Sequence, residues 1–432
     1  MAAASRITIA ATGAVTTIAI ARLLGPDGSG AYFVAQSVVL VLMVAATFGV
    51  EHGIAYYVSA GAWAPRPACG AALRMALAAG VAGAALGLAG RLLVPSAFAG
   101  LPVWATAVVI AGLPFALTWF YVSFVALAID RYEAYVLPPA AQSALVLVLA
   151  VPAAIAFDVE GAIAGMTAAS VIVAVAAAHW AQRSLPSGDA GASPGMLRKA
   201  ISFGIKGYAA NTLQLVNYRL DVFVLSAVAS AAAVGEYAVA VAVTSVLWLL
   251  PQALSEVLFP RVAHLSARDE REHREMVEVK SLRHVTLAVL ATTVLLAAAL
   301  LVLVVPIYGQ EFRDPIELGL ILLPGTALLG IGGVLSATIV GRGKPAYSMF
   351  IALLITPVTI ALYAVLIPEL DATGAALASS LSYAGNFALT CILYRRVTGR
   401  PVALMPTRSE FADLGRLPGA IRDWALAVRR SR

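Results

Sequence analysis

Long apolar runs separated by short polar connections fill most of this chain. A helix of about 20 consecutive apolar residues crosses the hydrocarbon core of a bilayer, and most of the runs reach that length. Hydrophobic residues make up 61% of the 432 residues and charged residues only 12%, which is not the balance of a soluble globular protein. We therefore expect an all-α, polytopic membrane protein with about twelve transmembrane helices.

The expected helices fall into two sets of six, separated by the hydrophilic stretch SLPSGDAGASPG, which has the composition of a linker. We expect four parts: an N-terminal six-helix bundle (1–183), a cytoplasmic linker (184–199), a C-terminal six-helix bundle (200–395) and a basic cytoplasmic tail (396–432). The expected spans are 7–24, 31–58, 69–94, 103–129, 136–157, 160–182, 200–228, 236–260, 282–307, 316–340, 346–368 and 373–395.

Two short motifs recur in the two halves of the chain. The first is Gly-x-Tyr followed by a Glu nineteen residues later, and the second is Asp-x-x-Gly-Ala at the start of the sixth and twelfth expected spans. Two matches at nearly the same offset indicate a duplicated bundle. The matched residues are Gly30 with Gly235, Tyr32 with Tyr237, Glu51 with Glu256, and Asp158 with Asp371.

The distribution of Lys and Arg predicts the orientation in the membrane. With a cytoplasmic N-terminus, the opposite face holds four of the 29 basic residues, namely Arg22, Arg91, Arg219 and Arg313. Cytoplasmic loops are normally the ones enriched in Lys and Arg. We therefore expect a multi-pass protein of the plasma (inner) membrane, surrounded by membrane lipids, with both termini in the cytoplasm.

Motifs for metal, nucleotide and redox chemistry are not evident in the sequence. Cys69 and Cys391 are far apart, and three of the five His lie nine and eleven residues apart in one loop without a Gly-rich phosphate loop. That loop reads as a solvated helix with i,i+4 pairs such as Glu270 with Arg274. We expect no metal, no bound cofactor and no nucleic-acid partner.

Three segments carry a family resemblance: ARLLGPDGSGAYFVAQSVV at the first corner, NYRLDVFVLSAVASAAAVGEYAVA, and VLFPRVAHL after Glu256. Through about residue 395 the chain resembles the polysaccharide-transporter, or O-antigen flippase (Wzx-like), branch of the multidrug/oligosaccharidyl-lipid/polysaccharide (MOP, MATE-like) exporter superfamily. The resemblance implies two six-helix lobes in a V around a central cavity that opens alternately to each face. It implies a polyprenyl-pyrophosphate-linked oligosaccharide as cargo, moved to the outer leaflet for cell-surface polysaccharide biosynthesis, and polysaccharide-assembly proteins as partners.

A polar stripe on the seventh expected span is the candidate cargo-binding surface. Four of its residues are spaced i, i+3, i+7 and i+10, which places them on one helical face. Such a face normally points into a bundle or an aqueous cavity, although hydrogen bonding between helices is the alternative. Amides could bind sugar hydroxyls, and aromatic rings could stack on a sugar ring. The candidates are Asn211, Gln214, Asn217, Tyr218 and Asp221, joined by Trp119 and Tyr121 of the fourth span.

Five charged residues lie near the ends of four expected spans. A rise of about 1.5 Å per residue places Arg22, Arg219 and Asp221 near the outer boundary, and Glu51 and Glu256 near the inner one. We expect an outer and an inner gate there, with the arginines as candidates for binding pyrophosphate. The carboxylates are candidates for H⁺ or Na⁺ coupling. Interfacial snorkelling or helix capping is the alternative for each charge.

Two other functions remain open at the level of sequence. A MATE-type multidrug/cation antiporter would share the fold, but it would need acidic residues deep in a lobe, where this chain carries mainly amides and aromatics. A membrane polysaccharide polymerase or ligase would need a sizeable outer-face loop with catalytic groups, whereas the longest hydrophilic stretches here are expected in the cytoplasm. We therefore expect a transporter rather than an enzyme.

Overall fold

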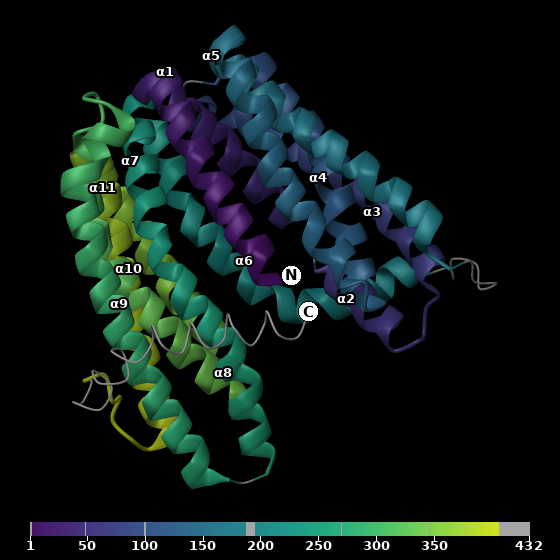
Figure 1. Cartoon of the computed structure of the whole chain (residues 1–432), viewed down its shortest axis with the longest axis vertical. Helices are drawn as coiled ribbons and strands as arrows, with labels where there is room; N and C mark the ends of the chain where they lie inside the picture. The colour runs from purple at the N-terminus through teal and green to yellow at the C-terminus, as the bar shows by residue number, and fades with distance from the viewer. Residues whose placement is uncertain are drawn as a thin grey trace, which may run out of the picture. The chain divides into compact units, whose positions relative to one another are not determined.

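The structure is a computed structural model. It describes residues 2–47, 49–98, 101–186, 195–268, 270–344 and 346–405, while the side chains of residues 2–4, 205–218, 257, 260 and 267 lie outside the described part. Within these ranges the chain is helical and contains no strand. Eight of the described helical stretches are long and apolar enough to cross a membrane. The expected class, an all-α multi-pass membrane protein, is confirmed (Figure 1).

The helices follow the apolar runs in sequence order. They are α1 (Ala2–Thr47), α2 (Val50–Ser59), α3 (Pro65–Leu93), α4 (Val103–Ala128), α5 (Tyr132–Ser184), α6 (Met196–Val228), α7 (Ala231–Thr244), α8 (Leu249–Ala267), α9 (Arg271–Tyr308), α10 (Asp314–Gly341) and α11 (Ala346–Thr398), with short 3₁₀ helices η1 (Pro95–Phe98) and η2 (Ser245–Trp248).

Breaks inside three of these helices separate successive apolar runs. α1 breaks at Gly25, which has a φ of 64° and precedes Pro26, and α5 and α11 break at Asp158 (φ 51°) and Asp371 (φ 48°). α5 and α11 have 53 residues each and would be about 80 Å long if straight, more than twice the bilayer core. Each therefore holds two membrane-length legs. The total of twelve spans and the two-bundle repeat stay predictions.

Two of the expected spans are interrupted where the sequence predicts continuous helices. The 31–58 run is divided between α1 and α2, with Gly49 (φ 71°) as the N-cap of α2, and the 236–260 run is divided by the 3₁₀ helix η2. Apolar residues lie on both sides of each break, so the hydrophobicity of the run as a whole predicts one continuous helix. Glu51 and Glu256 therefore lie on α2 and α8, which begin after these breaks.

The described chain forms two compact units that are discontinuous in sequence. Unit 1 comprises Met1–Ala242, Val302–Gly319 and Val358–Ala378, and unit 2 comprises Val243–Leu301, Leu320–Pro357 and Ser379–Arg432. Cys69 on α3 is a buried thiol of unit 1, and Cys391 on α11 is a half-buried thiol of unit 2. The boundaries predicted for the two bundles, the linker and the tail stay predictions.

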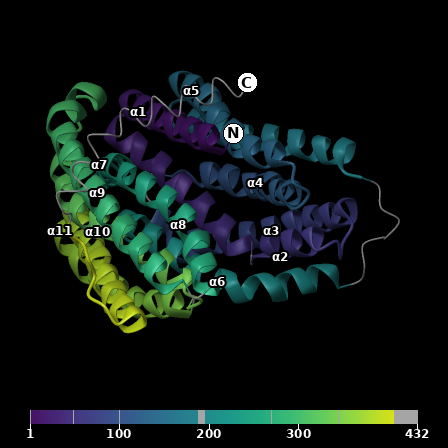
Figure 2. The same cartoon turned by 60° about the horizontal axis from the view of Figure 1, so that its bottom comes forward.

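Small residues allow the helices of unit 1 to pack closely. Figure 2 shows α3 beside α4, and α4 also packs against α5. The buried face of α3 is mostly Ala and Gly, and a Cβ at Gly80 would overlap Pro114 of α4. Close backbone approach through small residues is typical of helices packed within membranes. Leu113 and Leu117 of α4 fill the core that results.

The repeated glycines Gly30 and Gly235 lie at one helix contact within unit 1. A Cβ on Gly30 would overlap the carbonyl oxygen of Ala231, and a Cβ on Gly235 would overlap that of Pro26. The start of α7 therefore touches the backbone of α1 just after its Gly25 break. The glycine of the Gly-x-Tyr motif is present in both halves because neither backbone leaves room for a side chain at this contact.

Ion pairs connect three segments of unit 2. The Nε of Arg342, just after α10, donates to Oε1 of Glu278 on α9 at 2.8 Å, and Arg400 pairs with Glu275 at 2.7 Å. Arg271 also pairs with Glu275 in the i,i+4 spacing expected for this segment. Burial lowers the pKa of Arg342, but the hydrogen bonds that Arg342 donates to Glu278 and the negative charge of Glu278 more than offset this, so the pKa is raised above its ordinary value.

Candidate functional site

The candidate site lies within unit 1, where α2 packs against the first turns of α6. A Cβ at Gly53 would meet the backbone of Ala200, and a Cβ at Gly204 would overlap the carbonyl oxygen of Gly49. Residues 147 and 155 positions apart in the sequence are thereby brought into direct backbone contact. The contact fixes α2 and α6 as two adjoining walls.

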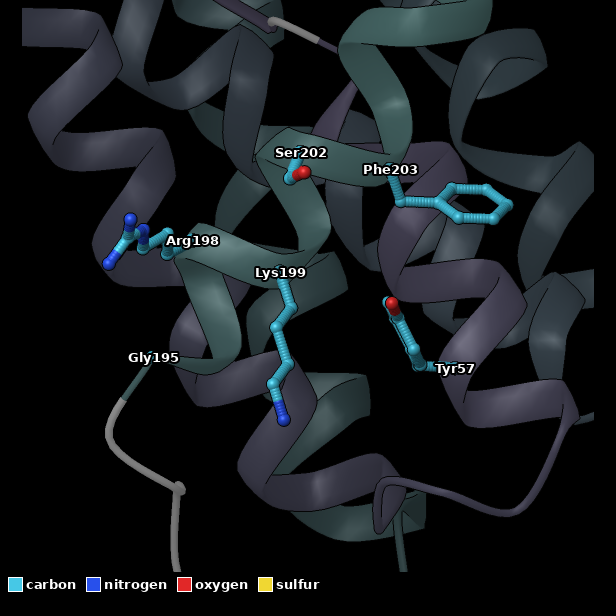
Figure 3. A pocket seen from close by; sticks show the side chains of 6 residues that line it. All are labelled: Tyr57, Gly195, Arg198, Lys199, Ser202 and Phe203. Atoms are coloured by element: carbon cyan, nitrogen blue, oxygen red, sulfur yellow. The ribbon is translucent and has the colours of Figure 1, made fainter.

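A cavity of about 490 Å³ opens between these two walls. Figure 3 shows Lys199 of α6 and Tyr57 of α2 on opposite sides of the hollow, with Arg198 on the same turn as Lys199 and pointing to the side. The residues that line it are Tyr57, Gly195, Arg198, Lys199, Ser202 and Phe203.

One side of this cavity is cationic. Arg198 and Lys199 are exposed, and neither is paired with a carboxylate within the described part of the chain. Both belong to the first turn of α6, whose initial N–H groups lack intrahelical partners and favour negative charge. This side can therefore bind an anion.

Aromatic rings form the other side. Tyr57 stacks on Trp63 with ring centroids 4.3 Å apart, and Tyr56 stacks on Phe203 at 4.4 Å. Aromatic faces suit apolar chains and sugar rings, and the Ser202 hydroxyl adds a hydrogen-bonding group.

The sequence did not predict this cavity. The signal available was the Arg-Lys pair at the end of the predicted linker, but nothing in the sequence connected it with Tyr57.

Glu51 is a buried carboxylate on α2. It lies in the first turn of the helix, its side chain is 1% exposed, and its Oε1 is 3.8 Å from Nε2 of His52. Its Oε2 is buried without a hydrogen-bond partner among the described residues. Tyr57 follows six residues later, about 9 Å along the same helix. Burial makes the charged form of this carboxylate costly in free energy. The coupling role of Glu51 stays a prediction.

Asp221 and Arg219 have defined partners in unit 1. The Tyr237 hydroxyl donates to Oδ2 of Asp221 at 2.6 Å, and the backbone N–H of Val222 donates to Oδ1 at 2.7 Å. The Arg219 guanidinium carbon lies 5.2 Å from the centre of the Phe33 ring, within cation–π distance. The tyrosine of the repeated motif thus joins α7 to α6, while the gating roles stay predictions.

The side chain of Arg22 lies against the C-terminal end of α9. Its Nε and Nη2 donate to the carbonyl oxygens of Ile307 and Pro306, in the last turn of α9. These carbonyls lack intrahelical partners, and a cation there is favourable. The capping alternative is therefore realised in the structure, and pyrophosphate binding by Arg22 stays a prediction.

Trp119 and Tyr121 face different sides of α4. Tyr121 is fully buried and donates to the carbonyl oxygen of Thr47, whereas Trp119 is half-buried with its ring edge-on to Phe120. Two residues along a helix differ by about 200° in direction, so they do not share one surface. Contact of either ring with cargo stays a prediction.

The other predicted site residues are not brought together by described contacts. Glu256 is exposed on α8, in unit 2. The side chains of the α6 stripe lie outside the described residues, so their part in cargo binding stays a prediction; they are Asn211, Gln214, Asn217 and Tyr218. No cluster of His, Cys, Asp and Glu suited to a metal occurs among the residues that the structure describes.

Comparison with known proteins identifies the family. Residues 19–317 match the family described as "Polysaccharide biosynthesis protein", which is more than half of the chain. The chain belongs to this family. The resemblance to polysaccharide-biosynthesis proteins inferred from the sequence is confirmed by this match. No curated protein matches the chain.

Solved structures of membrane transporters and of a lipid flippase are similar in fold to this chain. An inward-facing multidrug-resistance MATE transporter matches with a TM-score of 0.75 and 16% identity over 91% of this chain and 94% of that one. The lipid II flippase MurJ, in an inward closed conformation, matches at 0.68 and 12% over 90% and 86%. A MOP transporter from Pyrococcus furiosus matches at 0.58 and 14% over 91% and 94%. These identities support the fold alone.

Proposed function

We propose that the chain is a flippase that moves a polyprenyl-pyrophosphate-linked oligosaccharide from the cytoplasmic to the outer leaflet of the plasma membrane. The observation that carries this proposal is the match of residues 19–317 to a polysaccharide biosynthesis family on a chain with a transporter fold. Sugar building blocks made inside the cell must cross a bilayer to reach a surface polymer. A transporter in that process supplies the crossing without making or breaking bonds.

The physical task is to lower the barrier for a charged, sugar-bearing headgroup. Burying polar groups without partners costs several kcal/mol or more, and ionised groups cost much more. The described part of unit 1 offers the cationic Arg219, the half-buried indole of Trp119 and the cavity beside Lys199. These groups suit a diphosphate and sugars, and the polyprenyl chain would stay in the membrane lipids.

Transport by alternating access would require a driving force, and the flipped product would require proteins that receive it. We include H⁺ or Na⁺ coupling in the proposal, with Glu51 as the first carboxylate to test because it is buried. Asp221 is the second, held by Tyr237. Polysaccharide-assembly proteins would receive the flipped product at the outer face, and both termini would stay in the cytoplasm.

Deleting the gene tests the function directly. In the source organism, we expect the deletion to lose surface polysaccharide and to accumulate the lipid-linked intermediate in the cytoplasmic leaflet. Wild type should restore the polymer, and Arg219→Ala should fail to restore it at matched expression. Arg268→Ala, which removes a cation that is 64% exposed on a loop of unit 2, serves as the control and should complement.

The same strains separate the flippase from a MATE-type antiporter, which the TM-score of 0.75 to a multidrug-resistance transporter makes the second candidate. Unchanged surface polysaccharide together with greater drug sensitivity in the deletion strain would overturn the flippase and support the antiporter. A loss of polymer with normal delivery of the intermediate to the outer leaflet would point instead to a polymerase or ligase.

A further inference from the structure

We propose that the cavity between Tyr57 and Lys199 is the loading site for the diphosphate of an isoprenoid-linked substrate at the cytoplasmic face of unit 1. The inference rests on the proposed function and deepens it, because it assigns the headgroup to a cavity outside the residues that the sequence singled out. The cytoplasmic position follows from the predicted topology, in which the linker before α6 lies inside the cell.

The charge of the cavity fits a diphosphate. Arg198 and Lys199 are neighbours on the first turn of α6, and neither has a carboxylate partner within the described ranges. Two cations without carboxylate partners complement a group that carries at least two negative charges. Gly195 precedes them with a φ of 89°, and the space where its Cβ would stand is open to at least 4 Å. A phosphate can therefore approach the backbone at the start of the helix.

The aromatic side fits what is joined to the diphosphate. The stacked pair Tyr57 and Trp63 and the stacked pair Tyr56 and Phe203 present ring surfaces beside the cations. Ring surfaces accept both the apolar faces of sugars and the first isoprene units of a lipid. The cavity volume of about 490 Å³ falls within the range of about 300–1,000 Å³ typical of small-ligand sites.

The walls of the cavity are preorganised. Gly53 and Ala200, and Gly49 and Gly204, hold the backbones of α2 and α6 in contact next to it. Lys199 directly precedes Ala200, so this contact fixes the turn that carries the cation. A preorganised site loses less free energy to ordering when ligand binds. The two helices that form the cavity walls are therefore held in place by direct backbone contact.

Binding to the purified full-length protein tests the proposal, with farnesyl pyrophosphate as the probe. We expect Arg198→Gln/Lys199→Gln to weaken binding by about tenfold or more, because both charge-assisted contacts are lost. The charge-conserving swap Arg198→Lys/Lys199→Arg should retain binding. The control Arg131→Gln/Arg183→Gln removes two exposed cations expected at the same membrane face and should change affinity by less than about twofold.

Three further probes identify the source of the phosphate. Inorganic pyrophosphate lacks the isoprenoid and farnesol lacks the diphosphate, so both should bind more weakly than farnesyl pyrophosphate. Equal affinity for inorganic pyrophosphate would overturn the proposal in favour of a soluble ligand. If phosphatidylglycerol micelles compete as well as farnesyl pyrophosphate itself, the proposal is overturned in favour of general attraction to anionic lipid. The same conclusion follows if the double variant and its control lose equal affinity for farnesyl pyrophosphate.

Complementation separates this proposal from the proposed function. If the deletion strain loses surface polymer but Arg198→Gln/Lys199→Gln binds farnesyl pyrophosphate and complements normally, the loading site is wrong and the flippase stands. If the deletion leaves polymer unchanged while the double variant loses binding, the diphosphate site stands and the flippase is wrong.

Discussion

Glu51 is a carboxylate in a surrounding that does not favour its charge. Its side chain is 1% exposed, and one of its oxygens has no hydrogen-bond partner in the described structure. A buried ionised group without full compensation destabilises a fold by at least about 1 kcal/mol. Asp221 is as deeply buried but receives hydrogen bonds from Tyr237 and Val222. Of these two buried acids, Glu51 is the one with a carboxylate oxygen left without a hydrogen bond in the described structure.

Replacing Glu51 by Gln distinguishes an effect of the carboxylate on stability from an effect on transport. Glu51→Gln removes the charge at nearly constant volume, so we expect the melting temperature in detergent to rise, corresponding to about 1 kcal/mol. If the carboxylate serves coupling, surface polysaccharide should fall in the same variant. The measurements are thermal unfolding of the purified protein and polymer content of the complemented deletion strain.

The control for this variant is Glu160→Gln, an exposed carboxylate on α5. It should change neither the melting temperature nor the polymer content, since exposed charges contribute little. A lower melting temperature for Glu51→Gln would contradict the prediction and make Glu51 a structural partner of its neighbours. Normal polymer content in a stabilised variant would exclude its coupling role.

At the level of elements, the contact between α1 and α7 depends on two glycines. Gly30→Ala would place a methyl group against the carbonyl oxygen of Ala231. Backbone cannot yield as a flexible side chain does, so we expect a loss of stability of at least about 2 kcal/mol, measured by thermal unfolding. Gly235→Ala should have a similar effect from the other side of the contact.

Gly13→Ala is the matched control on the same helix. No atom lies within 4 Å of the position that its Cβ would occupy, so the change should raise helix stability by about 0.5–1 kcal/mol. Equal effects of Gly30→Ala and Gly13→Ala would show that the α1–α7 contact is not close in the folded protein.

The positions of the helices were predictable because a span leaves a long apolar run in the sequence. The repeated Asp-x-x-Gly-Ala motif coincides with the breaks in α5 and α11, because Asp158 and Asp371 are its first residues. The positive φ angles of these two residues were not predictable. The break before Gly49 and the 3₁₀ helix η2 were missed. These interruptions leave the run apolar, so only packing between helices reveals them.

Much less of the candidate site could be predicted from the sequence. The sequence singled out Asp221 as a charge within a span, but its hydrogen-bond partner Tyr237 belongs to another helix. The cavity joins Tyr57 to Lys199 across more than 140 residues, and neither stands out in the sequence among the aromatic and basic residues expected at a membrane boundary. Such a site is defined by tertiary contact between α2 and α6, for which hydrophobicity patterns contain no signal.

For the whole molecule, an even number of spans requires both termini on one face. We expect a green fluorescent protein fused to either terminus to fluoresce and an alkaline phosphatase fused there to be inactive, because the basic loops stay in the cytoplasm. A phosphatase inserted beside Arg313, on the predicted outer face, should be active. An active phosphatase at only one terminus would contradict the twelve-span topology.

The two cysteines place one thiol in each compact unit of the chain. Cys69 belongs to unit 1 and Cys391 to unit 2, and a thiol reacts with a maleimide dye only once it is reached by water. Replacing one cysteine with alanine leaves a single reporter in the other unit. Labelling rates during heating would then give separate unfolding curves for the two units, without introducing any foreign label site.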